Sequence, residues 1–324
     1  MEIGWERRNK IYKIEKKVVA RLFKEFLSKN RVESIEFLTG GLSNTNYKVH
    51  LKGYTECFVL RIYTREASSW NKEVAIFKLL QEIVPIPQLV YASDDKGIIP
   101  ENIAIFKFIE GQTLAQLMHN RYEPGERLME ELGEKLALIH QFQYNKMGFL
   151  GNDIGSVESE EPISKLIENY AIEPLINGPA RNRIGYDKAE RLIEFLKTNN
   201  HLLNTSQPAV LTHGDFKPTN LLINRKNKLV GILDWEFAFS GPCFFDMGQM
   251  LRYEDELPGS FSNHFINGYQ RNSKHSIQPN WKRLAKLVDL INLIGFLNLA
   301  EERPKMVVEV KTLIHKTMHN WHYH

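Results

Sequence analysis

The chain has 324 residues, of which 43% are hydrophobic and 25% charged, and its formal net charge is +3. These values are typical of a globular protein with room for two subdomains, and they argue against a nucleic-acid binder that relies on bulk positive charge. No apolar run reaches the roughly 20 residues needed to cross a bilayer. The first residues are charged from Glu2 onward, so we expect no signal peptide there, and only two cysteines occur. We therefore expect a cytoplasmic protein without membrane or nucleic-acid partners.

The first hundred residues predict a small sheet with one long helix. An amphipathic helix is expected over residues 9–29, because apolar side chains recur there every three or four positions. A second helix is expected over 70–82, before a proline pair. Alternating or continuous apolar residues predict five strands, at 35–38, 47–51, 57–63, 88–92 and 102–108.

Two adjacent glycines, Gly40 and Gly41, lie in the turn between the first two strands. Because glycine has no Cβ, backbone N–H groups in such a turn can approach a phosphate closely. Ser43 and Asn44 follow directly and add side-chain donors. The turn is therefore a candidate phosphate-binding loop, although a plain hairpin turn would have the same sequence.

Arg61 is a lone cation in the apolar third strand, and Glu73 lies in the first turn of the helix expected over 70–82. Arg61 either extends its charge to water along the strand or binds phosphate, which a guanidinium can do bidentately. Glu73 is favourably placed near a helix N-terminus. The sequence alone leaves both interpretations open.

Helices are expected to dominate after residue 109. A linker at 108–114 contains a glycine and a threonine that can cap the next helix. The helices predicted from apolar periodicity span 125–142, 163–176, 187–200, 244–253, 259–271, 280–300 and 304–320.

The stretch that carries chemistry is His213-Gly214-Asp215-Phe216-Lys217-Pro218-Thr219-Asn220, which precedes a strand at 229–233 that ends in Asp234. The two apolar segments predict a hairpin that presents Asn220 and Asp234 at neighbouring ends. Magnesium prefers oxygen ligands, which an amide and a carboxylate both supply. An alcohol is a poor nucleophile at neutral pH, so a carboxylate such as Asp215 can assist by aligning it.

This block resembles the catalytic core of the aminoglycoside phosphotransferase and choline kinase-like family of small-molecule kinases. The resemblance rests on His213-Gly214-Asp215, on a proline two residues before Asn220, and on Asp234-Trp235-Glu236 about fifteen residues later. It extends over about residues 35–300. The resemblance implies an α+β, bilobal protein-kinase-like fold, with a small β-rich N-lobe over 1–108 and a larger, mainly helical C-lobe over 109–324.

The resemblance also implies roles for individual residues. Asp215 would meet the acceptor hydroxyl, and Lys217, which protein kinases share, would neutralise the γ-phosphate unless it is a surface lysine. Asn220 and Asp234 would hold Mg²⁺. The nucleotide contacts would come from the glycine turn, from Arg61 paired with Glu73, and from the backbone of the linker; the residues concerned are Gly40, Gly41, Ser43, Asn44, Arg61, Glu73, Lys107 and Ile109.

Three neighbouring residues have open or supporting roles. His213 would brace the loop. Glu236 would either hold the metal-binding residues in place or bind the metal ion through a water molecule. Asp246 either caps the next helix or bonds back to the catalytic loop.

The implied activity is transfer of the γ-phosphate of ATP, or GTP, to a hydroxyl of an aminoglycoside-like or other small acceptor. The alternatives are a metabolite kinase of the homoserine, choline, methylthioribose or sugar-amine type, and a nucleotide-binding pseudokinase. A protein kinase is disfavoured because Asp234 and Asp246 leave no room for an activation segment. Acidic residues within 153–161 and 254–256 would favour a cationic acceptor if they faced the cleft, but a solvated surface explains them as well. A monomer or homodimer is expected.

Overall fold

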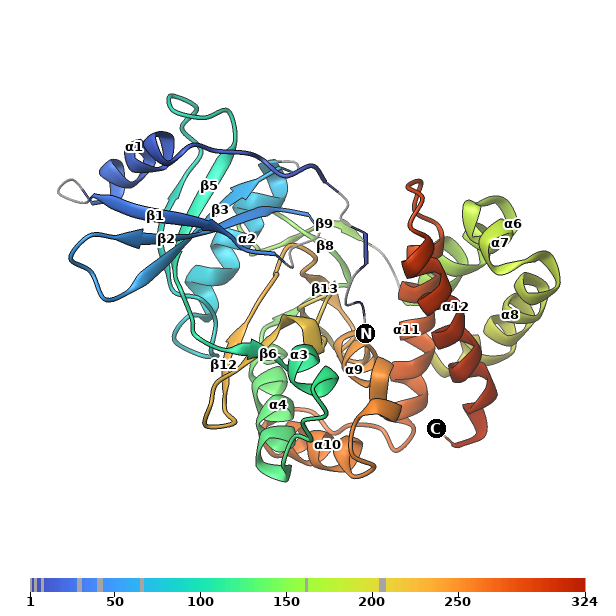
Figure 1. Ribbon diagram of the computed structural model, residues 1–324. Coiled ribbons are helices and arrows are strands. Elements are labelled where there is room, and N and C mark those ends of the chain that lie inside the picture. Colours follow the sequence, from blue (N-terminus) through green and yellow to red (C-terminus); the bar gives the residue numbers. More distant parts are fainter. Residues whose placement is uncertain are drawn as a thin grey trace.

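The computed structural model describes residues 2, 5–6, 9–27, 31–39, 43–64, 67–160, 163–203 and 208–323, without the side chains of 67–68 and 163–164. An antiparallel sheet forms the N-terminal part, and a mostly helical region follows it (Figure 1). The expected α+β, kinase-like fold class is thereby confirmed.

The N-terminal sheet has the strand order β1-β2-β3-β5-β4, and every neighbouring pair is antiparallel. Helix α1 (Lys16–Phe26) packs its buried side chains on one face of the sheet, and α2 (Ala67–Leu80) packs on the other (Figure 1). The strands are β1 (Val32–Phe37), β2 (Thr45–Leu51), β3 (Cys57–Tyr63), β4 (Leu89–Ser93) and β5 (Asn102–Lys107).

The first predicted helix was too long. Residues 9–15 are not helical, and the side chain of Ile11 is 41% exposed although the helical pattern assigned it to the buried face. The Tyr12 N–H donates instead to Thr45 Oγ1 at 3.0 Å, and the Tyr47 hydroxyl donates to the Tyr12 carbonyl at 2.9 Å. Contacts with the sheet therefore override the helical periodicity of this segment.

Helices dominate the remainder, as expected. The helix predicted over 163–176 is divided by a π-helical turn (Glu168–Ile172) into α5 (Ile163–Ile167) and α6 (Glu173–Asn177), and α7 (Pro179–Ile184) follows. The other helices are α3 (Leu114–His119), α4 (Glu126–Ile139), α8 (Tyr186–Asn199), α9 (Phe244–Met250), α10 (Phe261–Asn272), α11 (Trp281–Leu297) and α12 (Pro304–His319).

Two small sheets carry the chemistry-bearing block. The predicted hairpin is present as β11 (Leu221–Ile223) and β12 (Leu229–Ile232), and β6 (Gln112–Thr113) pairs with β11. The second sheet has the order β7-β10-β13-β8-β9. Its strands are β7 (Gln143–Tyr144), β8 (Gly148–Leu150), β9 (Val157–Glu160), β10 (Ala209–Thr212) and β13 (Phe239–Gly241).

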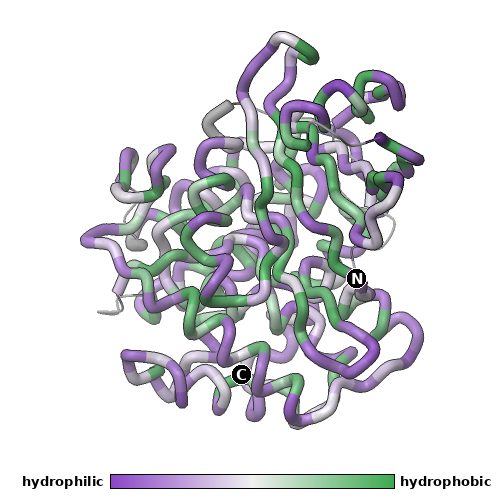
Figure 2. The backbone as a smooth tube through the Cα atoms, turned by 90° about the vertical axis from the view of Figure 1, so that its left-hand side faces the viewer, coloured by the Kyte–Doolittle hydropathy of each residue, from purple (hydrophilic) through white to green (hydrophobic). Residues whose placement is uncertain are grey.

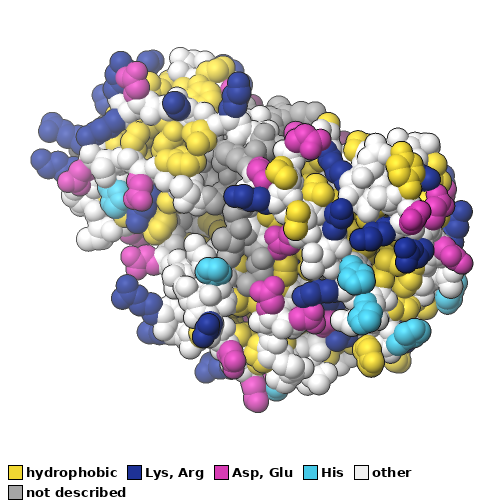
Figure 3. Space-filling model, turned by 45° about the vertical axis from the view of Figure 1, so that its right-hand side comes forward, with side chains coloured by type: hydrophobic (Ala, Val, Ile, Leu, Met, Phe, Trp, Pro, Cys, Tyr) yellow, Lys and Arg dark blue, Asp and Glu magenta, His cyan; other side chains and the backbone are white. Residues whose placement is uncertain are grey.

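Hydrophobic segments lie in the inner strands and helices, and hydrophilic ones follow the outer loops (Figure 2). On the face shown in Figure 3, acidic and basic side chains are interspersed, which agrees with the small net charge. Of the helices that the structure describes, none is both long and apolar enough to cross a bilayer. Cys57 is half-buried, Cys243 is buried, and both are free thiols.

Candidate active site

A cleft of about 1400 Å³ is bordered by the N-terminal sheet, the linker after β5 and the loop after β10. Every predicted site residue that the structure describes lines this cleft, except Glu73, which lies behind Arg61. The glycine turn itself, Gly40 and Gly41, falls outside the described residues. The fold thus gathers side chains that are almost two hundred residues apart in the sequence.

The loop after β10 owes its shape to Gly214 and His213. Gly214 has a φ of 79°, and a Cβ at this position would overlap the Phe237 carbonyl oxygen. The buried His213 ring accepts a hydrogen bond from the Asp215 N–H at Nδ1 (3.1 Å) and donates to the Leu233 carbonyl from Nε2 (2.9 Å). Burial lowers the pKa of His213. The neutral imidazole therefore braces the loop, as the sequence suggested.

Helix α9 holds the same loop from behind. The Asp246 carboxylate accepts the N–H groups of His213 (2.8 Å) and Gly214 (2.9 Å), which is one of the two roles that the sequence left open, and it also contacts His140 Nε2 at 3.1 Å. Gln249, one turn later, donates to the Gly214 carbonyl at 2.7 Å and accepts the N–H of Phe216 at 2.8 Å. The sequence analysis missed Gln249, because an amide inside a helix has no distinctive local pattern.

Both oxygens of the Asp215 carboxylate are fixed by neighbours in its own loop. The Asn220 amide nitrogen donates to Oδ2 at 2.7 Å, and Lys217 Nζ lies 2.7 Å from Oδ1. Lys217 is only 7% exposed, so it is not a surface lysine. Burial works against its charge, but the carboxylates of Asp215 and Glu2 outweigh that effect and raise the pKa of Lys217. The residue remains a buried cation beside Asp215.

Asn220 and Asp234 are brought together by the β11–β12 hairpin, where the Leu233 N–H donates to the Asn220 carbonyl at 2.8 Å. Because the Asn220 amide nitrogen serves Asp215, the amide oxygen is the atom that can ligate a cation. The described residues contain no group of three acidic, histidine or cysteine side chains that could hold a metal. Mg²⁺ commonly binds to one or two carboxylates plus substrate phosphates and water, so this donor pair fits it.

Arg61 links the sheet to this hairpin. Its guanidinium contacts Glu73 Oε1 at 3.0 Å and Asp234 Oδ1 at 2.9 Å. Arg61 is 7% exposed and therefore does not extend to water. Burial opposes its charge, but the two carboxylates more than compensate and raise the pKa of Arg61. Because α2 begins at Ala67, Glu73 lies in the second turn of the helix and not in the first.

The remaining nucleotide-side residues are also at the cleft. The Asn44 amide donates to Glu236 Oε2 at 2.9 Å, so Glu236 meets the strand that follows the glycine turn. Ser43 is buried, and both residues line the cleft. The Lys107 N–H already donates to the Gln88 carbonyl at 3.0 Å and is therefore not available to a base. Contacts of adenine with Lys107 and Ile109 stay a prediction.

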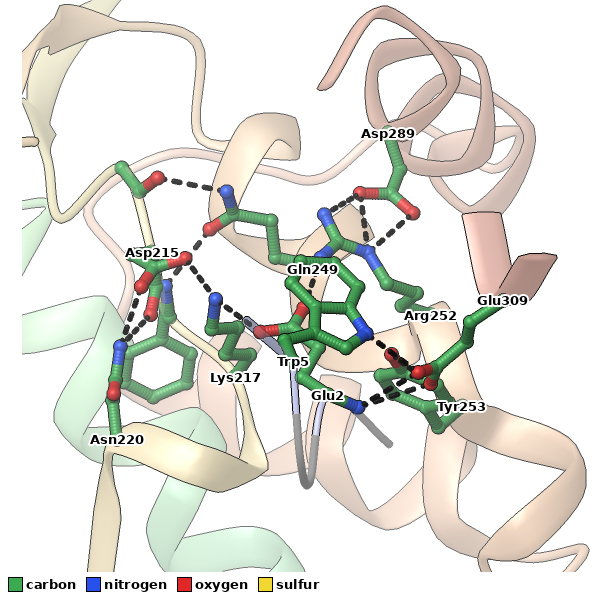
Figure 4. A network of polar contacts seen from close by, with 12 residues as sticks. Glu2, Trp5, Asp215, Lys217, Asn220, Gln249, Arg252, Tyr253, Asp289 and Glu309 are labelled. Atoms are coloured by element: carbon green, nitrogen blue, oxygen red, sulfur yellow. Dashed lines mark hydrogen bonds and ion pairs between the residues drawn. The ribbon is translucent and has the colours of Figure 1, made fainter. Parts of the chain in front are cut away.

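A polar network that the sequence analysis missed continues from Lys217 (Figure 4). The Glu2 carboxylate lies 2.5 Å from Lys217 Nζ and 2.7 Å from Arg252 Nη1. Arg252 in turn binds Asp289 from Nη2 at 2.6 Å. Asp289 interrupts an apolar helix and is a charge of the kind that had drawn attention to Arg61, whereas Arg252 is followed closely by the acidic run over 254–256 and has no such signal.

The acidic run over 254–256 does not line this cleft. Glu254 pairs with Lys282 and Lys286, each at 2.9 Å, and Asp255 lies 3.4 Å from Lys316. Lysine partners thus neutralise Glu254 and Asp255, so these two residues do not favour a cationic acceptor.

Comparison with known proteins gives a consistent result. A family model described as "Phosphotransferase enzyme family" matches residues 34–287. The GDP complex of an aminoglycoside 2'-phosphotransferase superposes with a TM-score of 0.65 at 20% identity and covers 95% of this chain and 99% of that chain. An aminoglycoside phosphotransferase bound to AMP-PNP and hygromycin B gives a TM-score of 0.63 at 15% identity, covering 92% and 98%. A gentamicin complex of a third such enzyme gives 0.64 at 18%, covering 95% and 98%. At these identities the structural likeness shows the fold.

Proposed function

The chain belongs to the phosphotransferase enzyme family, and we propose that it transfers the γ-phosphate of ATP or GTP to a hydroxyl group of a small molecule, with Mg²⁺ as cofactor. The observation that carries this proposal is the fixation of Asp215 by Asn220 and Lys217, at the end of the hairpin that carries Asp234.

In the proposed reaction, Asp215 accepts a hydrogen bond from the acceptor hydroxyl and aligns it with the phosphate. The transition state of phosphoryl transfer is usually loose, so orientation contributes more than early deprotonation. Lys217 neutralises charge on the transferred group. Both side chains are held by neighbours before any substrate binds, which reduces the reorganisation that the reaction requires.

On the nucleotide side, Arg61 would bind the α- and β-phosphates while Glu73 fixes its orientation. Asn220 and Asp234 would hold Mg²⁺, which when bound neutralises charge on the phosphate oxygens. Asp234 would exchange its contact with Arg61 for the cation. A cleft of about 1400 Å³ exceeds the usual size of a single small-ligand pocket and leaves room for a nucleotide and an acceptor together.

The proposal is tested by Asp215→Asn in an assay of Mg²⁺-dependent nucleotide consumption, screened over aminoglycosides and metabolite alcohols. We expect kcat to fall by about 10²–10⁴-fold while nucleotide affinity is retained, because Asp215 contacts the acceptor and not the nucleotide. The exposed Asp187 of α8, changed to Asn, is the matched control and should leave turnover intact. Turnover unaffected by Asp215→Asn would contradict the mechanism. Nucleotide binding without turnover on any acceptor would favour a pseudokinase.

A further inference from the structure

We propose that Lys217 and Arg252 form a carboxylate-binding subsite of the acceptor pocket, so that the acceptor is a small hydroxylated molecule with a carboxylate group. In the free protein, the Glu2 carboxylate occupies this subsite. The inference rests on the proposed function, because it assigns a substrate class to the same cleft.

The subsite is a pair of buried cations that share one carboxylate. Glu2 Oε2 lies 2.5 Å from Lys217 Nζ, and Glu2 Oε1 lies 2.7 Å from Arg252 Nη1, so each oxygen has its own cation (Figure 4). Lys217 is 7% exposed and Arg252 5%. Charge-assisted hydrogen bonds from two fixed cations are among the stronger ways to recognise a carboxylate.

The two cations are positioned without any help from Glu2. Asp215 pairs with Lys217, and Asp289 receives Arg252 Nε at 3.1 Å and Nη2 at 2.6 Å. Each cation therefore already has a fixed carboxylate of its own, and their charges balance within the two pairs. Removal of the Glu2 carboxylate would leave N–H groups of both cations directed to one place, where the carboxylate of a ligand could take over the two contacts that Glu2 makes.

The subsite lies next to the proposed reaction centre. Lys217 Nζ contacts Asp215 Oδ1 at 2.7 Å as well as Glu2, so one ammonium group lies between Asp215 and the bound carboxylate. A hydroxyl that Asp215 aligns and a carboxylate that Arg252 binds would therefore belong to one small molecule. That geometry describes a hydroxy acid or a hydroxy amino acid.

Glu2 is held by contacts that do not themselves require its carboxylate. Its backbone N–H donates to both oxygens of Glu309, at 3.0 and 3.2 Å, and the Trp5 indole donates to Glu309 at 2.7 Å. Trp5 also packs edge-on against Phe296, with ring centroids 5.1 Å apart. Glu2 and Trp5 are thus anchored on α12 and α11, and rotation of the Glu2 side chain alone would vacate the subsite.

A different interpretation gives Glu2 the opposite role. Its carboxylate would then remain in place and bind the ammonium groups of a cationic acceptor. The two interpretations predict opposite effects of removing Glu2, which makes Glu2→Ala the informative variant. Glu15→Ala is the matched control, because Glu15 is exposed, does not line the cleft and pairs with the exposed Lys17 at 2.9 Å.

The experiment measures binding of three probes of similar size by calorimetry: glycerate, glycerol and 3-aminopropane-1,2-diol. We expect Glu2→Ala to lower the Kd for glycerate at least about tenfold, with little change for glycerol and none in Glu15→Ala. Glu2→Gln should have a smaller effect in the same direction, since the amide oxygen can still accept a hydrogen bond from one of the two cations. An unchanged Kd for glycerate, or weaker binding of the amino diol in Glu2→Ala, would overturn the subsite.

Phosphate transfer to the same probes separates this inference from the proposed function. Transfer to glycerate with a lower KM in Glu2→Ala supports both. Transfer to glycerol or the amino diol, without any gain for glycerate, leaves the proposed function intact and overturns the subsite. If Glu2→Ala binds glycerate more tightly but phosphate is transferred to none of the probes, the two cations still form a carboxylate site. That result would overturn the proposed function, and with it the assignment of the site to a phosphate acceptor.

Discussion

Single residues in the loop after β10 are constrained from several sides. His213 illustrates the consequence for stability, because its ring is buried, neutral and hydrogen-bonded to backbone groups on both nitrogens. Protonation would turn Nδ1 from an acceptor into a donor facing the Asp215 N–H. The folded loop therefore excludes a proton that the unfolded chain accepts near neutral pH.

The first prediction concerns the pH dependence of this loop. Burial lowers the pKa of His213 in the folded state, below the value of about 6.5 in the unfolded chain. Stability from His213 is therefore fully present above about pH 6.5 and is lost as the pH falls, by up to about 1.4 kcal/mol per pH unit. His213→Gln removes the titration. Denaturant unfolding at several pH values should show that the difference in unfolding free energy between the wild type and His213→Gln becomes smaller below about pH 6.5. Plots of unfolding free energy against pH that run parallel for the two proteins would refute the prediction.

The second prediction concerns Gly214. Its φ of 79° is disfavoured for other residues, and a Cβ would overlap the Phe237 carbonyl oxygen. We expect Gly214→Ala to lower the free energy of unfolding by about 1–3 kcal/mol and to reduce turnover, because the loop must shift. Gly259→Ala is the control, since nothing lies within 4 Å of a Cβ there. Equal unfolding midpoints for the two variants would contradict this account.

The sequence predicted those site residues that belong to a local motif or stand out from their neighbours in the chain. Asn220 and Asp234 were placed together because apolar runs predict the hairpin between them. Asp215 was assigned through the resemblance of its loop to the catalytic motif of the family. Arg61 was found because a charge in an apolar strand is costly unless it is paired. Glu2 could not be found in this way, because it contacts Arg252 across 250 positions and its own neighbours have no pattern that indicates the contact.

At the scale of elements, α4 packs closely against α10. A Cβ on Gly133 of α4 would overlap the Phe265 carbonyl oxygen of α10, and a Cβ on Gly268 of α10 would overlap the Glu130 carbonyl oxygen of α4. The two glycines thus let the backbones approach from both sides. In sequence, they are indistinguishable from any helical glycine.

The third prediction follows from this packing. Gly133→Ala and Gly268→Ala should each lower the free energy of unfolding by about 1–3 kcal/mol, because the helices must separate to admit the methyl group. Gly295→Ala in α11 is the control, since nothing lies within 4 Å of a Cβ there. That variant should be neutral, or more stable by up to about 1 kcal/mol through helix propensity. A control that is destabilised as much as the test variants would contradict the packing argument.

The observed bounds of the strands and helices show where local sequence patterns fail to predict secondary structure. The five strands of the first sheet were predicted within a few residues, because alternation and turn residues are local signals. The segment over 9–15 has helical periodicity but is held by Thr45 and Tyr47, which lie in a different element. Tertiary contacts of this kind are not encoded within the segment itself.

At the scale of the whole molecule, polar contacts join the sheet and α2 of the N-terminal part to the segment that follows β12, and three of them involve side chains of the cleft region. Arg61 binds Asp234, Asn44 binds Glu236, and the ammonium group of Lys72 donates to the Ala238 carbonyl at 2.8 Å. All three involve the segment that follows β12. A ligand that binds there would therefore affect how the two parts are held together.

The fourth prediction uses this arrangement. ADP with Mg²⁺ should stabilise the protein against thermal unfolding, by about 2.7 kcal/mol at a hundredfold excess over Kd. In Asp234→Asn the stabilisation by ADP should remain but lose its dependence on Mg²⁺, because a carboxylate ligand is replaced by a weaker amide. Asp187→Asn is the control. An unchanged Mg²⁺ dependence in Asp234→Asn would show that the cation binds elsewhere.

The claim that this chain transfers phosphate to a small-molecule alcohol is tested most directly by following the phosphate itself. The protein is incubated with Mg²⁺, ATP and a panel of hydroxylated molecules, glycerate among them, and the products are analysed by phosphorus NMR and mass spectrometry. The account predicts one phosphomonoester of the acceptor for each ADP formed, and a loss of this product in Asp215→Asn. Formation of ADP and inorganic phosphate alone, with no phosphorylated acceptor, would contradict it.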